Sequence, residues 1–110
     1  MKIHANRLAT GEKKKLLAEV SKIKELKFTT YSLDKIKQRG ISVDTLGETI
    51  TKGRLIEYHI KEDTRRVLLR CKGGTCAVVD LDKESIITAY KNDPNYNHPH
   101  LDQTKYLFGA

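Results

Sequence analysis

The chain has 110 residues, 38% of them hydrophobic and 32% charged, which suits one folded domain and excludes a disordered polypeptide. The net charge is +7, and the excess lies in residues 1–40, which hold 11 Lys and Arg against 4 Asp and Glu. A basic segment on a neutral body favours a polyanionic partner such as RNA. The same lysines could instead form only a solvated helix face.

No apolar run approaches the ~20 residues that a membrane span needs, and no signal-peptide core follows Met1. We therefore expect a cytoplasmic protein with no membrane partner. The sequence has no glycine-rich phosphate loop, no G-x-S-x-G and no HExxH. This disfavours nucleotide hydrolysis and serine or zinc protease chemistry.

Residues 10–26 show the spacing of an amphipathic helix that begins with Thr10 as its N-cap. Its expected inward residues are Leu16, Leu17, Val20 and Ile23. Lysines occupy much of the remaining surface, namely Lys13, Lys14, Lys15, Lys22 and Lys24. This helix either binds the phosphates of a nucleic acid with its lysines or is a structural helix whose polar face is simply solvated.

Two shorter helices are expected next, after a β-leaning stretch at residues 28–31 that is either a brief strand or an extended lead-in. Ser32 caps the first, which ends at Gly40, and Ser42 caps the second, which ends at Gly53. Their expected buried residues are Leu33, Ile36, Val43, Leu46 and Ile50. The polar side of the first could extend a nucleic-acid surface with Lys35, Lys37 and Arg39.

Four strands are predicted over residues 54–91, in the runs RLIEYHI, TRRVLLRC, TCAVVDL and SIITAYK. Two-residue turns at Glu62-Asp63 and Gly73-Gly74 would fix most of the register. The expected fold is α+β, with N-terminal helices packed on one face of a four-stranded antiparallel meander. We expect a single domain in which residues 10–53 are helical, 54–91 form the sheet, and 92–110 form a loop and a docking segment.

This register divides the sheet into two faces. The apolar face is expected to carry Ile56, Tyr58, Ile60, Val67, Leu69, Cys71, Cys76, Val78, Ile87 and Ala89. The mixed face is expected to carry Glu57, His59, Arg66, Leu68, Arg70, Val79, Thr88 and Tyr90. The two cysteines would lie directly opposite one another, as reduced thiols in the cytosol.

The mixed face carries residue types that can cleave RNA without a metal or other cofactor. His59 can exchange a proton near neutral pH, and Arg66 and Arg70 offer forked donors to phosphate oxygens. Glu57 lies on the same side of the strand as His59, and Tyr90 could stack a base or share a proton. Ordinary surface side chains that pair across the strands, with Glu57 neutralising an arginine, would give the same pattern without any catalytic role.

A second histidine cluster lies in the tail, in the run NHPHLD. His98, His100 and Asp102 could serve as metal ligands, support catalysis, or be exposed loop residues. No set of side chains completes the four ligands of a structural zinc site.

The order of motifs gives a family resemblance over residues 28–91. A helix, the run SLDKIKQRGIS, a second helix and the strands GRLIEY, RVLLR, VVDL and IITAY follow one another. This order resembles small bacterial and phage domains allied to the RelE and BrnT ribonuclease toxins, in the broad class of barnase, EndoU and the colicin nucleases. The resemblance implies a nuclease site on the free face of the sheet. Relatives often have His-Ala where this chain has Tyr31-Ser32.

The leading hypothesis is a metal-independent endoribonuclease of the toxin type that acts on cellular RNA. His59 would be the general acid or base, Arg66 and Arg70 would hold the phosphate, and Tyr90 would assist. An acidic antitoxin or immunity protein is then the expected partner. The alternatives are a non-catalytic phage- or plasmid-encoded regulator that binds nucleic acid or protein, and a structural or inhibitor protein.

Overall fold

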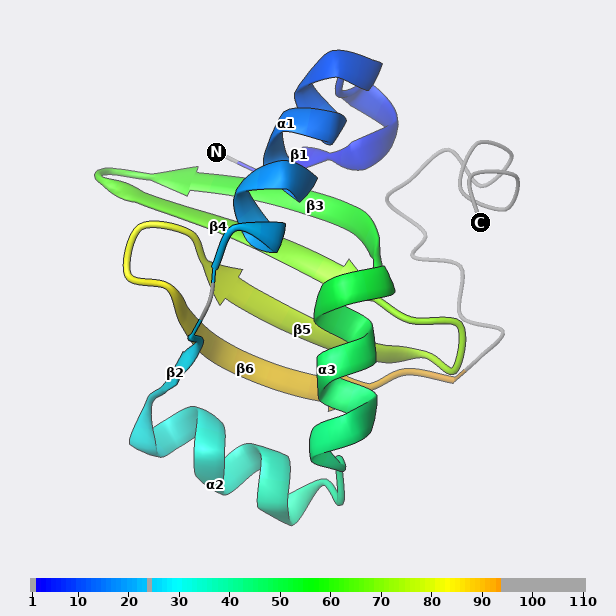
Figure 1. Ribbon diagram of the computed structural model, residues 1–110, viewed down its shortest axis with the longest axis vertical. Coiled ribbons are helices and arrows are strands. Elements are labelled where there is room, and N and C mark those ends of the chain that lie inside the picture. Colours follow the sequence, from blue (N-terminus) through cyan, green and yellow to red (C-terminus); the bar gives the residue numbers. More distant parts are fainter. Residues whose placement is uncertain (1, 24, 94–110) are drawn as a thin grey trace.

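The computed structural model describes residues 2–23 and 25–93. Its strands form one six-stranded sheet in the order β1-β3-β4-β5-β6-β2, and its α-helices pack on one face of that sheet (Figure 1). In chain order the elements are β1 (Lys2–His4), the 3₁₀ helix η1 (Ala5–Arg7), α1 (Thr10–Ser21), β2 (Lys27–Phe28), α2 (Thr30–Gln38), α3 (Val43–Lys52), β3 (Arg54–Lys61), β4 (Thr64–Arg70), β5 (Thr75–Asp80) and β6 (Ser85–Lys91). The expected α+β class is confirmed.

The sheet is larger than the predicted meander. Strands β3 to β6 form that meander, but β1 extends it antiparallel to β3, and β2 extends it parallel to β6. The prediction of a four-stranded, purely antiparallel sheet is therefore wrong. Both added strands are too short for a period-two pattern to show in the sequence. The β-leaning stretch is a strand only at its first residue, Phe28, because α2 already begins at Thr30.

The helix boundaries follow from their caps. The N-cap of α1 is Ala9 rather than Thr10. The N-cap of α2 is Thr29, and Ser32 is the third helical residue. The two form a capping box: the Thr29 side chain accepts the Ser32 N–H at 3.0 Å, and the Ser32 side chain accepts the Thr29 N–H at 2.9 Å. Ser42 caps α3, as predicted, by accepting the N–H of Thr45 at 3.1 Å.

The helix predicted over residues 10–26 is shorter than expected, because α1 ends at Ser21. The predicted ends of the two shorter helices are confirmed. Gly40 adopts φ of +64° after α2, and the N–H of Ile41 reaches back to the carbonyl of Ile36 at 3.1 Å. This left-handed cap turns the chain so that both isoleucines enter the core. Gly53 follows α3, as expected, and leads directly into β3.

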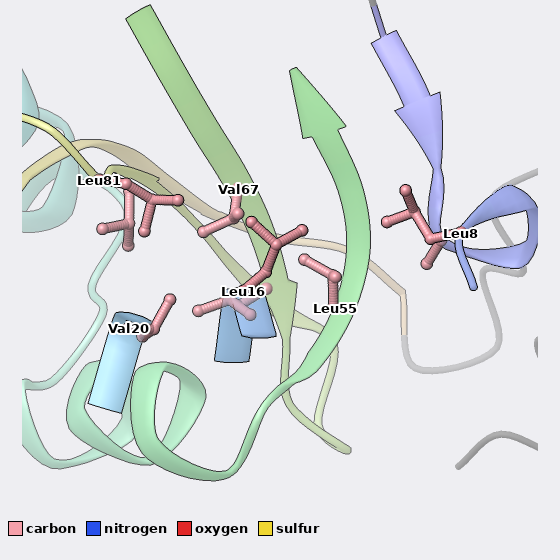
Figure 2. Packing of buried hydrophobic residues seen from close by; sticks show 9 residues of the cluster. Leu8, Leu16, Val20, Leu55, Val67 and Leu81 are labelled. Atoms are coloured by element: carbon pink, nitrogen blue, oxygen red, sulfur yellow. The ribbon is translucent and has the colours of Figure 1, made fainter. Parts of the chain in front are cut away.

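The core lies between the helices and the sheet. Figure 2 shows Leu16 of α1 beside Leu55 and Val67 of the sheet, and Val20 and Leu81 belong to the same cluster. A second cluster joins α2 and α3 to β5 and β6 through Ile36, Ile41, Leu46, Ala77, Ile86 and Ala89.

Three predicted core positions are wrong. Leu17, Leu33 and Val43 are exposed, at 37%, 41% and 80%. Val43 is the first residue of α3, which buries Leu46 and Thr49 instead, and α2 buries Ser32 and Ile36 instead of Leu33. In each case the apolar side chain lies off the helical stripe that contacts the sheet.

The predicted register holds for the β3–β4 hairpin, where His59 pairs with Arg66 and Glu57 with Leu68. It is wrong by one residue in β5. The N–H of Cys71 bonds to the carbonyl of Thr75 at 2.9 Å, so the loop has three residues rather than two, and Gly74 adopts φ of +93°.

This slip exchanges the faces of β5 alone. Ala77 and Val79 point to the helices, whereas Cys76 and Val78 do not. The predicted opposition of the cysteines is therefore wrong, and both are free thiols. An irregularity between Val78 and Val79 also places Ile86, not Ile87, in the core. A second one, between Leu55 and Glu57, adds Leu55 to the first cluster, and the predicted residue Ile56 is also buried, at 1% exposure.

Candidate functional site

Strand alternation places His59 and Arg66 on the side of the sheet away from the helices. Their strand neighbours Tyr58 and Val67 pack in the helix-side core, and successive side chains of a strand point to opposite faces. We call the side that carries Glu57, His59 and Arg66 the helix-free face. The sequence-predicted pair of imidazole and guanidinium therefore lies on neighbouring strands of one face.

A pocket of about 240 Å³ opens at the tip of the β3–β4 hairpin. It is lined by His59, Lys61, Glu62, Thr64 and Arg66. The histidine, the arginine and the lysine give it a proton-transfer group and two cations, and the threonine adds a hydroxyl donor. Glu62 adds one negative charge, but the two cations outnumber it, so the pocket suits a small anion such as phosphate.

The pKa of His59 lies below its ordinary value of 6.5. Burial is the largest cause, and neighbouring positive charges that include Lys2 and Arg66 act in the same direction, while Glu57 acts in the opposite one. The imidazole is therefore held in its neutral form near pH 7. A neutral imidazole can accept a proton, which is the requirement for a general base.

Arg66 has an unsatisfied donor. Its Nε is buried and has no hydrogen-bond partner among the described residues. Asp80 is its partner in the β4–β5 ladder, but Asp80 Oδ1 accepts the backbone N–H groups of Asp82 and Lys83, both at 3.0 Å. A buried donor without a partner costs about 1–3 kcal/mol, so a bound anion would offset that cost.

Strand β1 brings two residues to this face that the sequence analysis missed. Lys2 pairs with His59, and His4 pairs with Glu57. The Glu57 carboxylate lies 4.0 Å from Lys2 Nζ and 3.7 Å from His4 Nδ1. The polar-apolar-polar run Lys2-Ile3-His4 was the available signal, but three residues are too few to identify a strand.

Arg70 and Tyr90 share the face but not the pocket. Arg70 lies four residues beyond Arg66, or about 13 Å along the strand, and it pairs with Cys76, which in turn pairs with Tyr90. The Arg70 side chain is buried and donates to the carbonyl of Asp93 at 3.1 Å. The expected five-residue constellation is therefore divided between two ends of the sheet.

The basic helices lie on the opposite side of the sheet from His59. Lys13, Lys14, Lys15 and Lys22 belong to α1 or its C-cap, and Lys35 and Lys37 belong to α2, whereas Lys24 lies outside the described residues. Arg39 Nη1 donates to the carbonyl of Ala89 at 2.8 Å and so fastens α2 to β6. The described lysines of α1 and α2 therefore lie on the other side of the sheet from the pocket.

Within residues 2–23 and 25–93, no group of three or more His, Cys, Asp or Glu side chains could hold a metal ion. His98, His100 and Asp102 lie outside that part of the chain. Over the same described residues, no helix has both the length and the hydropathy needed to cross a bilayer.

Comparison of the chain with protein-family models, with curated proteins and with solved structures gives no match.

Proposed function

We propose that this protein is a metal-independent endoribonuclease that cleaves RNA at the pocket of the helix-free face. The observation that carries the proposal is the pairing of His59, whose pKa is lowered, with Arg66, whose Nε is buried without a partner among the described residues. One group accepts a proton and the other holds an anion. Those are two of the tasks in cleavage of a phosphodiester.

The reaction uses the 2′-hydroxyl of the substrate as the nucleophile. His59 accepts the 2′-hydroxyl proton while the O2′–P bond forms and the P–O5′ bond breaks. Arg66 holds the non-bridging oxygens, with Lys61 and Thr64 on the same pocket wall. The leaving O5′ takes a proton from solvent, and His59 later returns its proton to solvent. The products are a 2′,3′-cyclic phosphate and a free 5′-hydroxyl.

Under this proposal the RelE- and BrnT-like resemblance points to a toxin, and the expected partner is an acidic antitoxin or immunity protein. A pocket with two cations, one carboxylate and one histidine is best blocked by a partner with negative charge. Its acidic surface would cover Lys2, Lys61 and Arg66.

The test compares wild-type protein with His59→Ala on a short RNA in EDTA. Wild type should produce 2′,3′-cyclic phosphate ends by mass spectrometry, and His59→Ala should cleave about 10²–10⁴-fold more slowly. A matched control is Lys14→Ala, on the other side of the sheet, which should cleave at the wild-type rate. The same oligonucleotide with one 2′-deoxy residue at the scissile position should bind and stay intact.

The regulator hypothesis makes a different prediction from the same materials. It rests on the exposed lysines of α1, which lie away from the pocket. It predicts RNA binding that weakens with salt and with Lys14→Glu and Lys15→Glu, no turnover, and no effect of His59→Ala. RNA that stays intact with wild type at high protein concentration would favour this alternative over the nuclease.

A further inference from the structure

We infer that the pocket holds two consecutive phosphates of one RNA strand, and that Lys61 and Thr64 bind the phosphate next to the scissile one. This inference rests on the proposed ribonuclease function and deepens it. It names the substrate class as a single strand that carries at least two phosphates, because the pocket has donors for both.

The pocket is built from two rows of side chains on the β3–β4 hairpin. His59 pairs with Arg66, and Lys61 pairs with Thr64 in the last pair before the turn. All four side chains line the pocket. Each row lies two residues from the other along both strands, so the four side chains share the helix-free face. The two rows are therefore separated by about 7 Å.

That separation is close to the distance between neighbouring phosphates of a single RNA strand. A positively charged groove that follows such a strand presents donors to successive phosphates. The pocket volume of about 240 Å³ exceeds what the five heavy atoms of one phosphate occupy, at roughly 30 Å³ for each water-sized group. The scissile phosphate can therefore lie at the row of His59 and Arg66, and its neighbour at the row of Lys61 and Thr64.

The second row has donors that the fold does not use. Over the described residues, no ion pair or hydrogen bond engages the Lys61 ammonium or the Thr64 hydroxyl. Arg65, which lies between the two rows on β4, instead bonds to Glu19 and Asp82. An ammonium and a hydroxyl on neighbouring strands can both donate to the oxygens of one phosphate.

Glu62 opposes an anion in this half of the pocket. It is the first turn residue after Lys61, adopts φ of +54° and lines the same pocket. Over the part of the chain that the structure describes, its carboxylate has no ion-pair partner. Its charge therefore acts on an anion bound next to Lys61 and weakens that binding. Removal of the Glu62 charge should have the opposite effect to removal of the Lys61 charge.

The test measures binding, with uridine 3′,5′-bisphosphate as the probe. Its two phosphates are attached to one ribose and reproduce neighbouring phosphates of a strand. Isothermal titration calorimetry compares it with uridine 3′-monophosphate and with uridine 5′-monophosphate. The bisphosphate should bind wild type about tenfold or more tightly than either monophosphate, because it makes a second charge-assisted contact.

The variants assign the second contact to its residues. Lys61→Gln should reduce the advantage of the bisphosphate to less than about threefold, and Thr64→Val should reduce it by a smaller factor. Glu62→Gln should increase the advantage. The matched control is Glu84→Gln, which removes a carboxylate from another turn residue with positive φ, outside the pocket. It should leave all three affinities unchanged.

The outcomes separate this inference from the proposed function. A bisphosphate that binds no more tightly than a monophosphate, or an advantage that survives Lys61→Gln, would overturn the second row. The nuclease proposal would then still stand, because cleavage of a short RNA and its loss in His59→Ala test it separately. Protein that binds the bisphosphate through Lys61 but cleaves no RNA would support the two-phosphate pocket and overturn the nuclease proposal.

Discussion

Arg65 and Asp82 are joined by three hydrogen bonds on the helix side of the sheet. Arg65 Nε and Nη2 donate to Asp82 Oδ1 at 3.1 and 2.9 Å, and the Arg65 backbone N–H donates to Oδ2 at 3.2 Å. Arg65 Nη1 also donates to both carboxylate oxygens of Glu19 in α1, at 3.1 and 3.3 Å. Adjacent arginines thus have different roles, since Arg65 fastens a helix and a turn to β4, and Arg66 lines the pocket.

Replacing Arg65 should weaken the fold without changing the site. Arg65→Ala removes the bonds to Glu19 and Asp82 and should lower the melting temperature by about 5 °C or less, because the contacts are partly solvent-exposed. RNA cleavage per folded molecule should stay at the wild-type level. Calorimetry with parallel rate measurements checks this, and a loss of rate with an unchanged melting temperature would contradict it.

The same contact makes a pH prediction. The hydrogen bonds from Arg65 are the main reason that the pKa of Asp82 lies below its ordinary value. A group whose pKa is depressed on folding stabilises the folded state above its unfolded pKa and loses that effect as the pH falls through the folded value. The stability difference between wild type and Arg65→Ala should therefore be largest near neutral pH and shrink below about pH 4. Urea unfolding at pH 3 to 7 measures it.

Two glycines in or beside α3 should respond oppositely to alanine. A Cβ at Gly53 would overlap the backbone carbonyl of Thr49 and lie 3.3 Å from that of Arg70, so Gly53→Ala should destabilise by about 3 kcal/mol. A Cβ at Gly47 meets nothing within 4 Å, so Gly47→Ala should stabilise by about 1 kcal/mol. Chemical denaturation of both variants provides the comparison, and similar effects at the two sites would contradict it.

Protonation of His59 should oppose folding. Its pKa is lowered in the folded protein by burial and by positive charges that include Lys2 and Arg66, so the unfolded chain binds the proton more readily. The stability contribution of this residue is present above its unfolded pKa of 6.5 and is lost as the pH falls below it. The free energy of unfolding should therefore fall less for His59→Gln than for wild type between pH 7 and pH 5. Urea unfolding at several pH values measures this, and an equal pH dependence of the two proteins would show that His59 is not the group responsible.

The two thiols should differ in reactivity. Cys76 is fully buried, and burial raises its pKa to about 11, whereas Cys71 is only partly buried in the loop after β4. Cys71 should therefore react with iodoacetamide at least about tenfold faster than Cys76. Peptide mass spectrometry at partial labelling distinguishes them, and Cys71→Ser should leave a protein that is modified only after unfolding.

The accuracy of the sequence predictions depended on how strongly each strand distinguishes its two faces. In β3 the polar and apolar residues alternate from Ile56 to Lys61, and the two-residue Glu62-Asp63 turn then fixes the His59–Arg66 pair correctly. In β5 both faces are largely apolar, so nothing in the run TCAVVD opposes a shift, and the Gly73-Gly74 pair is compatible with either loop length. The prediction failed at that strand.

The site was predicted incompletely for a different reason. Face assignments ignore distance along a strand, so Arg70 and Tyr90 were grouped with His59 although they lie at the other end of the sheet. Lys2 and His4 were missed because their position depends on a long-range pairing with β3. Local patterns carry no information about such contacts.

The first 28 residues supply both borders of the sheet, β1 on one side and β2 on the other, with α1 spanning the distance between them (Figure 1). During synthesis these borders leave the ribosome before any of the four strands that they will enclose. The nascent chain therefore has no partner for β1 until β3 has been made, and none for β2 until Ile86, which pairs with Phe28, has been made. Assembly of this sheet is necessarily a late event, completed only when most of the polypeptide is available.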